Sequence, residues 1–127
     1  MSLKRTLAHR WKSLTGQNAA RQRAAQDAFD AVCATLKPGD LSVDLGANAG
    51  IYTLKLAATG ADVIAFEPDP YAFELLTTNV AGAANVTLKQ AAASSENGTM
   101  TLHRTANFDD DPARHTTSSS LVADKRN

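Results

Sequence analysis

Two short segments constrain this chain most: a glycine turn at residues 44–50, and Glu67 at the end of residues 65–67. The turn leaves one predicted strand and opens a helix, and Glu67 ends the next predicted strand 21 residues after Gly46. Glycines let a backbone approach a ligand closely, and the N-terminus of a helix attracts negative charge. A turn that exposes backbone N–H groups, followed by an acid about 20 residues later, is typical of domains that bind adenosine-containing ligands. The acid can accept hydrogen bonds from both ribose hydroxyls.

The details of the turn argue against a dinucleotide or a nucleoside triphosphate. Asn48 stands where a dinucleotide turn has its second glycine, and Gly50 is followed by Ile51 rather than by the Lys-Ser/Thr pair of a phosphate-binding loop. Asp44, two residues before Gly46, would repel a pyrophosphate but suits a ligand that carries an amine. S-adenosylmethionine has an adenosine, a carboxylate and an amine, so we predict it as the cofactor.

Length and composition favour one packed domain. The chain has 127 residues, of which 43% are hydrophobic, and no apolar run approaches the ~18 residues of a membrane span. The N-terminus lacks the continuous apolar stretch and cleavage site of a secretory signal. Cys33 is the one cysteine, which argues against a disulfide framework or a clustered-thiol metal site, and we expect a buried structural thiol. These features favour a cytoplasmic protein.

Charge is distributed unevenly although the 13 basic and 13 acidic residues balance. Residues 1–23 contain no acid and six bases: Lys4, Arg5, Arg10, Lys12, Arg21 and Arg23. Such an arm could bind nucleic acid, an anionic membrane or an acidic partner, or it could be the solvated face of an amphipathic helix. Trp11 is the one aromatic residue among these bases, so the stacking surface expected for RNA is weakly represented.

Apolar periodicity and turn residues predict alternating helices and strands. Two N-terminal helices are expected at residues 4–14 and 18–36, strands at 41–45, 61–66 and 86–90, and helices at 49–58 and 70–80. Ile51, Leu54 and Ala58 would form the inner face of the helix at 49–58. Asp69 and Pro70 predict the cap and first residue of the following helix.

The order of these elements predicts an α/β fold with a Rossmann-like, doubly wound parallel sheet. The near-continuous apolar run at residues 63–66 indicates a strand covered by helices on both faces. A further strand is expected at 99–103, followed by a polar loop at 104–127 with a short extended piece near Leu121. The predicted organisation is a helical segment at 1–36, a cofactor-binding half at 37–103 and the loop at 104–127.

Residues 43–50 and 65–70 together resemble the FkbM-type family of S-adenosylmethionine-dependent methyltransferases. Residues 91–94, Gly98, Leu102 and the Ser-Leu element at 119–121 extend the resemblance, which covers about residues 38–122. It implies the class I methyltransferase sheet of seven strands. It also implies a cofactor site with these roles: the turn of Gly46, Ala47, Asn48 and Gly50 along the methionine part, Asp44 near its amine, Glu67 on the ribose, and Gln90 or Ala91 beside the adenine.

The family continues into a fourth strand with an Asp-x-Glu-Gly element and three more strands, which residues 1–127 do not contain. In that strand order the first strand is central, so without the fourth strand residues 41–45 would form an exposed apolar edge. We therefore expect the N-terminal portion of a longer protein. A partner chain that completes the sheet, or a degenerate cofactor-binding half, is the alternative.

The predicted activity is S-adenosylmethionine-dependent methyl transfer to an oxygen of a small molecule or sugar, as the resemblance implies. An RNA methyltransferase that uses the basic arm, and a cofactor-binding or assembly module without turnover, are the alternatives. A base is needed only if the acceptor is a hydroxyl that must lose its proton. His103, His115 and the acidic run at 109–111 are present, but each is typical of an ordinary polar loop, and we assign no catalytic residue.

Overall fold

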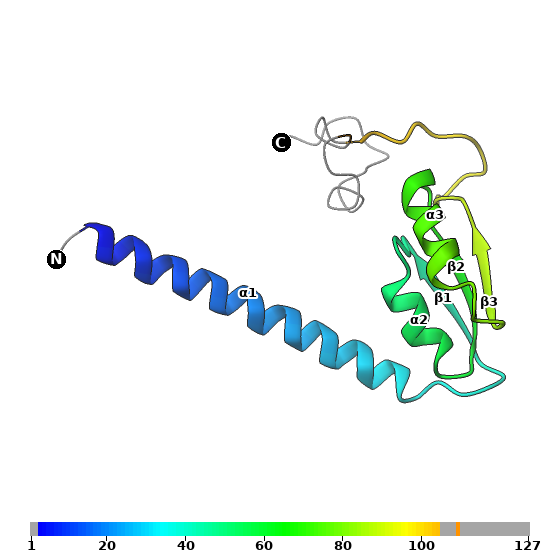
Figure 1. Cartoon of the computed structure of the whole chain (residues 1–127), viewed down its shortest axis with the longest axis horizontal. Coiled ribbons are helices and arrows are strands. Elements are labelled where there is room, and N and C mark those ends of the chain that lie inside the picture. Colours follow the sequence, from blue (N-terminus) through cyan, green and yellow to red (C-terminus); the bar gives the residue numbers. More distant parts are fainter. Residues whose placement is uncertain (1–2, 105–108, 110–127) are drawn as a thin grey trace. The chain divides into compact units, whose positions relative to one another are not determined.

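The structure, a computed structural model, describes residues 3–104 and residue 109. Contacts divide the chain into two units, Met1–Thr35 and Leu36–Asn127 (Figure 1). The division into domains at residues 36 and 103 stays a prediction. His115, the extended piece near Leu121 and the Ser-Leu element at 119–121 lie outside the described residues.

The N-terminal unit is one helix, α1, at Leu3–Cys33. The prediction of two helices with a break at residues 15–17 was wrong. Gly16 costs a helix only about 1 kcal/mol relative to alanine, and the alanines, glutamines and arginines that follow it are strong helix formers. Cys33 is half-buried rather than buried. Among residues 3–104, no helix combines the length and hydropathy that crossing a membrane requires.

The second unit alternates strands and helices: β1 at Leu41–Leu45, α2 at Ile51–Ala57, β2 at Asp62–Phe66, α3 at Pro70–Asn79 and β3 at Val86–Lys89. The strands form a parallel sheet in the order β1-β2-β3. This arrangement confirms the predicted α/β class with a parallel sheet. The strand predicted at 99–103 was wrong, since only His103 makes a single bridge and Met100 is 55% exposed.

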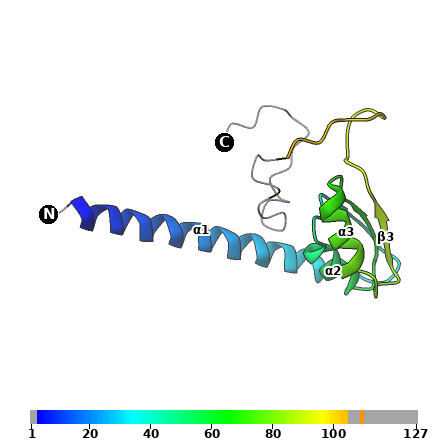
Figure 2. The same ribbon diagram turned by 45° about the horizontal axis from the view of Figure 1, so that its top comes forward.

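Both helices of this unit cover the same face of the sheet (Figures 1 and 2). Asp44 and Ala65 are register partners and therefore share a face. Thr53 of α2 bonds Asp44, and Leu76 of α3 packs with Ala65 in the buried core. That core is completed by Ala47, Val80 and three partly buried residues, Phe73, Val86 and Leu88.

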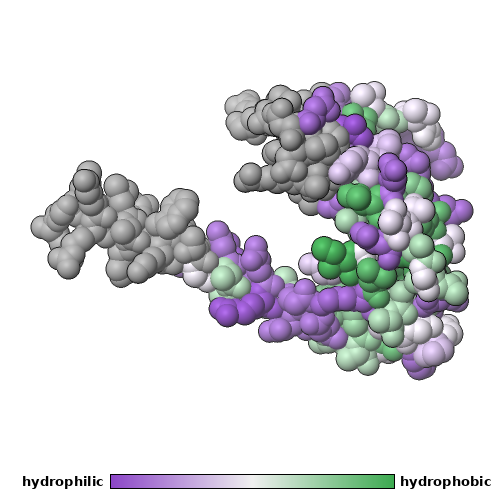
Figure 3. Space-filling model, viewed as in Figure 1, coloured by the Kyte–Doolittle hydropathy of each residue, from purple (hydrophilic) through white to green (hydrophobic). Residues whose placement is uncertain are grey.

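The opposite face of β1 is apolar and open. Leu41, Val43 and Leu45 are each more than half exposed, and β1 lies at the edge of the sheet formed by the described strands. Figure 3, which views the helix-bearing face, shows further hydrophobic residues exposed in the region of α2. The predicted exposed edge is therefore present. The helix layer expected on a second face is not found within the described part of this unit.

The inner face predicted for α2 was also wrong. Ile51 and Leu54 are 69% and 41% exposed, whereas Thr53 and Leu56 are buried. The apolar residues of this seven-residue helix lie on several of its sides, so the sequence pattern does not indicate which side is buried. The side of α2 that carries Thr53 and Leu56 is the buried one, and there Thr53 donates a hydrogen bond to Asp44 of β1.

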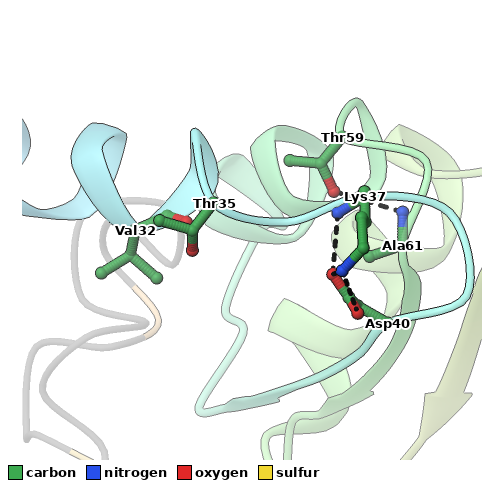
Figure 4. A network of polar contacts seen from close by, with 6 residues as sticks. All are labelled: Val32, Thr35, Lys37, Asp40, Thr59 and Ala61. Carbon is green, nitrogen blue, oxygen red and sulfur yellow. Dashed lines mark hydrogen bonds and ion pairs between the residues drawn. The ribbon is translucent and has the colours of Figure 1, made fainter.

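A short polar turn leads into β1 (Figure 4). The Lys37 backbone N–H donates to Asp40 Oδ2 over 2.9 Å, and Lys37 Nζ lies 3.2 Å from Asp40 Oδ1. Hydrogen bonds from the side chain and then the backbone of Lys37 lower the pKa of Asp40 below its usual 3.8. Asp62 N–H donates to the Asp40 carbonyl at the start of β2, so this turn aligns the first two strands.

Candidate cofactor site

The candidate site lies at the edge of the sheet where the parallel strands end. Leu45 and Phe66, the last residues of β1 and β2, are register partners, so the glycine turn and Glu67 follow at the same edge. Ligands of open α/β sheets bind outside this carboxyl edge. The fold therefore brings together Asp44, the turn and Glu67, as the spacing predicts.

Three backbone N–H groups of the turn are already bonded to the end of β2 or to Glu67, which follows it. The Phe66 carbonyl accepts hydrogen bonds from Gly46 N–H and Ala47 N–H over 2.8 and 2.9 Å. Asn48 N–H donates to Glu67 Oε2 over 2.8 Å. The expectation of a turn with exposed amide donors was therefore wrong for these three residues, which are used to join the turn to the strand.

Glu67 is the residue that links these parts. It is 6% exposed, and while Oε2 accepts from Asn48, Oε1 accepts from Asp69 N–H over 2.8 Å. A carboxylate has about four acceptor positions, so two remain after these bonds. Glu67 can therefore hold the turn in place and still accept hydrogen bonds from a ligand.

The two glycines of the turn have different surroundings. Both have positive φ angles, 80° at Gly46 and 90° at Gly50. A Cβ added at Gly50 would lie 2.8 Å from Leu76 Cδ1, whereas one added at Gly46 would meet no atom within 4 Å. Gly50 is thus required for the packing of α3 against the turn, and Gly46 leaves open space where a ligand could approach.

Asn48 occupies the place of the second glycine because it tolerates the same backbone conformation. Its φ is 48°, in the left-handed region that asparagine enters more readily than most residues. Its side-chain Oδ1 is buried and has no hydrogen-bond partner among the described residues. An unpaired buried acceptor is costly unless a donor occupies it, so this oxygen suits an N–H or O–H group of a ligand.

Asp44 is positioned by α2. Thr53, which is fully buried, donates its hydroxyl hydrogen to Asp44 Oδ2 over 2.6 Å, and Asp44 itself is half-buried. Asp44, Asn48 and Glu67 therefore present acceptor oxygens at one edge of the sheet. This donor-poor, acceptor-rich set fits a ligand that carries an ammonium group and hydroxyls.

Gln90 and Ala91 follow β3 and line a separate part of the same edge. Together with Phe66 and Pro68, which flank Glu67, and with residues 92–100 and Leu102, they line an open cavity of about 890 Å³. The structure therefore brings the predicted residues at the end of β3 close to those at the end of β2.

Two contributing residues, Thr53 and Arg104, were not predicted from the sequence, and neither was the ion-pairing role of Asp69. Asp69 was expected only as a helix cap, which it is, since Oδ1 accepts from Tyr71 N–H over 2.9 Å. Arg104 lies 35 residues away and also bonds Asp69. No local sequence pattern identifies Thr53 as the donor to Asp44, or Arg104 as the partner of Asp69.

Comparison with known proteins gives one sequence likeness and several structural ones, and no known family profile matches the chain. A stretch of 56 residues, 44% of this chain, is 45% identical to the ribosomal RNA small subunit methyltransferase A of Thermotoga neapolitana. The chain spans 22% of that relative's length. The sequence likeness is thus to part of a methyltransferase.

Solved structures are similar over about half of this chain. A candidate rRNA methylase from Clostridium thermocellum has a TM-score of 0.49 at 23% identity, over 54% of this chain and 40% of its own. An S-adenosylmethionine-dependent methyltransferase from Agrobacterium tumefaciens has a TM-score of 0.46 at 21% identity, over 57% of this chain and 24% of its own.

Proposed function

We propose that this chain binds S-adenosylmethionine at the carboxyl edge of its sheet and belongs to an enzyme that transfers the cofactor's methyl group. The observation that carries the proposal is the placement of Glu67. A buried carboxylate ends β2, is bonded to the glycine turn, and lies in the edge region that also has open space at Gly46. The 45% identity to a methyltransferase over 56 residues supports the same activity.

Three parts of the cofactor, its ammonium group, its ribose and its adenine, have matching groups in the site. The acceptor oxygens of Asp44 and Asn48 suit the ammonium group, and the free acceptor positions of Glu67 suit the ribose hydroxyls. The cavity lined by Gln90 and Ala91 suits the adenine. When bound, the cofactor supplies an electrophilic methyl group on a sulfonium.

The residues of this chain would hold and orient that group rather than react with it. Positioning of two reactants in this way can be worth roughly 7–11 kcal/mol. We assign no base, since a base is required only for an acceptor that must lose a proton.

Two acceptor classes are proposed, each with its own support. The relative's name identifies a ribosomal RNA substrate for that protein, and the six bases within residues 1–23 would favour a polyanion. The resemblance of residues 43–50 and 65–70 to the FkbM-type family supports a hydroxyl of a small molecule or sugar. A cytoplasmic location is proposed for either case.

Calorimetry with S-adenosylhomocysteine tests the cofactor site. We expect the wild-type chain to bind it, and Glu67→Gln to weaken binding at least about tenfold, because the amide NH₂ cannot accept hydrogen bonds. Glu74→Gln is the matched control, since it removes the same charge from an exposed position on α3. Circular dichroism shows whether each variant is folded.

Absence of binding by the wild-type chain, or equal binding by Glu67→Gln, would refute the proposed site. Binding without methyl transfer to any acceptor would favour the non-catalytic module.

Methyl transfer from labelled cofactor separates the two acceptor classes. An RNA acceptor predicts binding that weakens steeply with salt, with a slope of about −0.7 per neutralised phosphate for single strands. Neutralising Arg5, Arg10 and Lys12 should reduce that slope. Labelling of a small hydroxyl compound, with RNA binding absent, would support the other class.

A further inference from the structure

Asp69 is a buried carboxylate that serves two segments at once. Its side chain is 1% exposed, and it caps α3 by accepting from the N–H groups of Tyr71 and Ala72 over 2.9 and 3.4 Å. Arg104 also donates to both of its oxygens, from Nε to Oδ2 over 3.1 Å and from Nη2 to Oδ1 over 2.8 Å. Such a two-point pair fixes the orientation of the guanidinium as well as its distance.

Arg104 lies at the end of a long segment that has little regular structure. Residues 90–104 contain no helix or strand beyond the bridge at His103, and they supply most of the lining of the 890 Å³ cavity. In Figures 1 and 2 the chain after β3 extends beyond the end of the sheet and then turns back. One end of the segment is held by β3, and Arg104 holds the other end to the start of α3.

The opposite wall of the cavity adjoins the same carboxylate. Phe66 and Pro68 line that wall, and Pro68 directly precedes Asp69 in the chain. Asp69 N–H donates to Glu67 Oε1, whose other oxygen accepts from Asn48. A continuous series of bonds therefore connects Arg104, through Asp69 and Glu67, to the glycine turn.

We propose that Arg104 is a positioning residue for the cofactor site: by pairing with Asp69 it fixes the segment 90–104 against the end of β2, and so sets the wall that faces the adenine. The identity of the ligand in the cavity rests on the proposed function. The role of the Arg104–Asp69 pair in fixing the segment 90–104 does not. It predicts that loss of the pair loosens this wall selectively and weakens cofactor binding through that loosening.

Two variants remove the pair while they spare its surroundings. Asp69→Asn removes the charge but keeps a good helix cap, because asparagine caps helices about as well as aspartate. Arg104→Gln removes the guanidinium and leaves the cap intact. Arg21→Gln is the control, because Arg21 is an exposed arginine on α1. The double variant tests whether the two residues act together.

Two measurements read out the effect in the full chain. Amide hydrogen exchange follows the wall itself, and calorimetry with S-adenosylhomocysteine follows binding. We expect amides of residues 92–103 to exchange about tenfold faster in each variant, with the amides of β1 and β2 unchanged. We expect binding to weaken about tenfold in each single variant and no further in the double variant.

Four results would overturn the inference: unchanged exchange in residues 92–103, equally faster exchange throughout the sheet, unchanged binding despite faster exchange, or losses that add in the double variant. Faster exchange in all of the sheet would mean that the pair only stabilises the fold. If the wild-type chain binds no S-adenosylhomocysteine, the proposed function fails, and the exchange measurement alone decides whether the pair holds the wall.

Discussion

Replacing Gly50 with alanine should destabilise the second unit strongly, because two separate costs add at this position. The backbone at Gly50 has a φ of 90°, which costs an alanine about 1–2 kcal/mol. The added Cβ would also lie 2.8 Å from Leu76 Cδ1 and 3.2 Å from Val80 Cγ1, both in the buried core. Overpacking of this kind costs about 1–3 kcal/mol. We therefore expect Gly50→Ala to lower the free energy of unfolding by about 2–5 kcal/mol.

Gly39→Ala separates the two contributions. Gly39 has nearly the same φ, 94°, but an added Cβ would meet no atom within 4 Å, so only the backbone cost of about 1–2 kcal/mol applies. Urea unfolding followed by circular dichroism measures both variants. With a slope of about 1–2 kcal/mol per molar urea, an extra cost of about 2 kcal/mol lowers the midpoint by roughly 1–2 M.

Equal midpoints for the two variants would refute the claim that α3 packs against the turn at Gly50. The double variant with Leu76→Ala is a second test of the same contact. Removing the Leu76 side chain relieves the close contact, so the double variant should lose less stability than the sum of the single changes.

The remaining predictions concern Asn48 and Thr53. Asn48→Gly should change stability by no more than about 1 kcal/mol, whereas Asn48→Ala should cost about 1–2 kcal/mol, because alanine adopts a positive φ poorly. Urea midpoints measure both variants. An alanine variant as stable as the glycine variant would contradict this reasoning. Thr53→Val should cost about 1–3 kcal/mol, because it leaves Asp44 without its 2.6 Å hydrogen bond, whereas Thr53→Ser keeps the hydroxyl and loses only a methyl group, worth about 0.8 kcal/mol. A valine variant more stable than the serine one in the same assay would show that this bond does not stabilise the fold.

Most of the fold of the second unit could be predicted from local sequence signals, because tertiary packing does not override them. Strand positions and the cap at Asp69 were predicted because apolar runs, Gly and Pro mark them directly. The face of α2 could not be predicted, since residues 51–57 are apolar on several sides. The strand at 99–103 was a wrong prediction because alternation describes a half-exposed segment without specifying a partner strand.

Site residues were predictable where spacing along the chain determines position in space. Parallel register places the ends of β1 and β2 together, so Asp44, the turn and Glu67 could be grouped from sequence. Their hydrogen-bond partners could not. Thr53 lies nine residues after its partner Asp44, and Arg104 lies 35 residues after its partner Asp69. No local sequence pattern predicts contacts at these separations.

The hydrogen bonds of Glu67 show that a carboxylate at this position has a structural role in addition to its proposed role in ligand binding. Asn48 N–H and Asp69 N–H both donate to it, and without a carboxylate these donors would lose their acceptor in a region where Glu67 is 6% exposed. The acid is therefore needed to join the turn to α3 even when no ligand is bound. A ribose diol would use acceptor positions that these two bonds leave free. The spacing between Gly46 and Glu67 consequently reflects both folding and binding, and its presence in a sequence indicates this local architecture more directly than it indicates any particular acceptor of the methyl group.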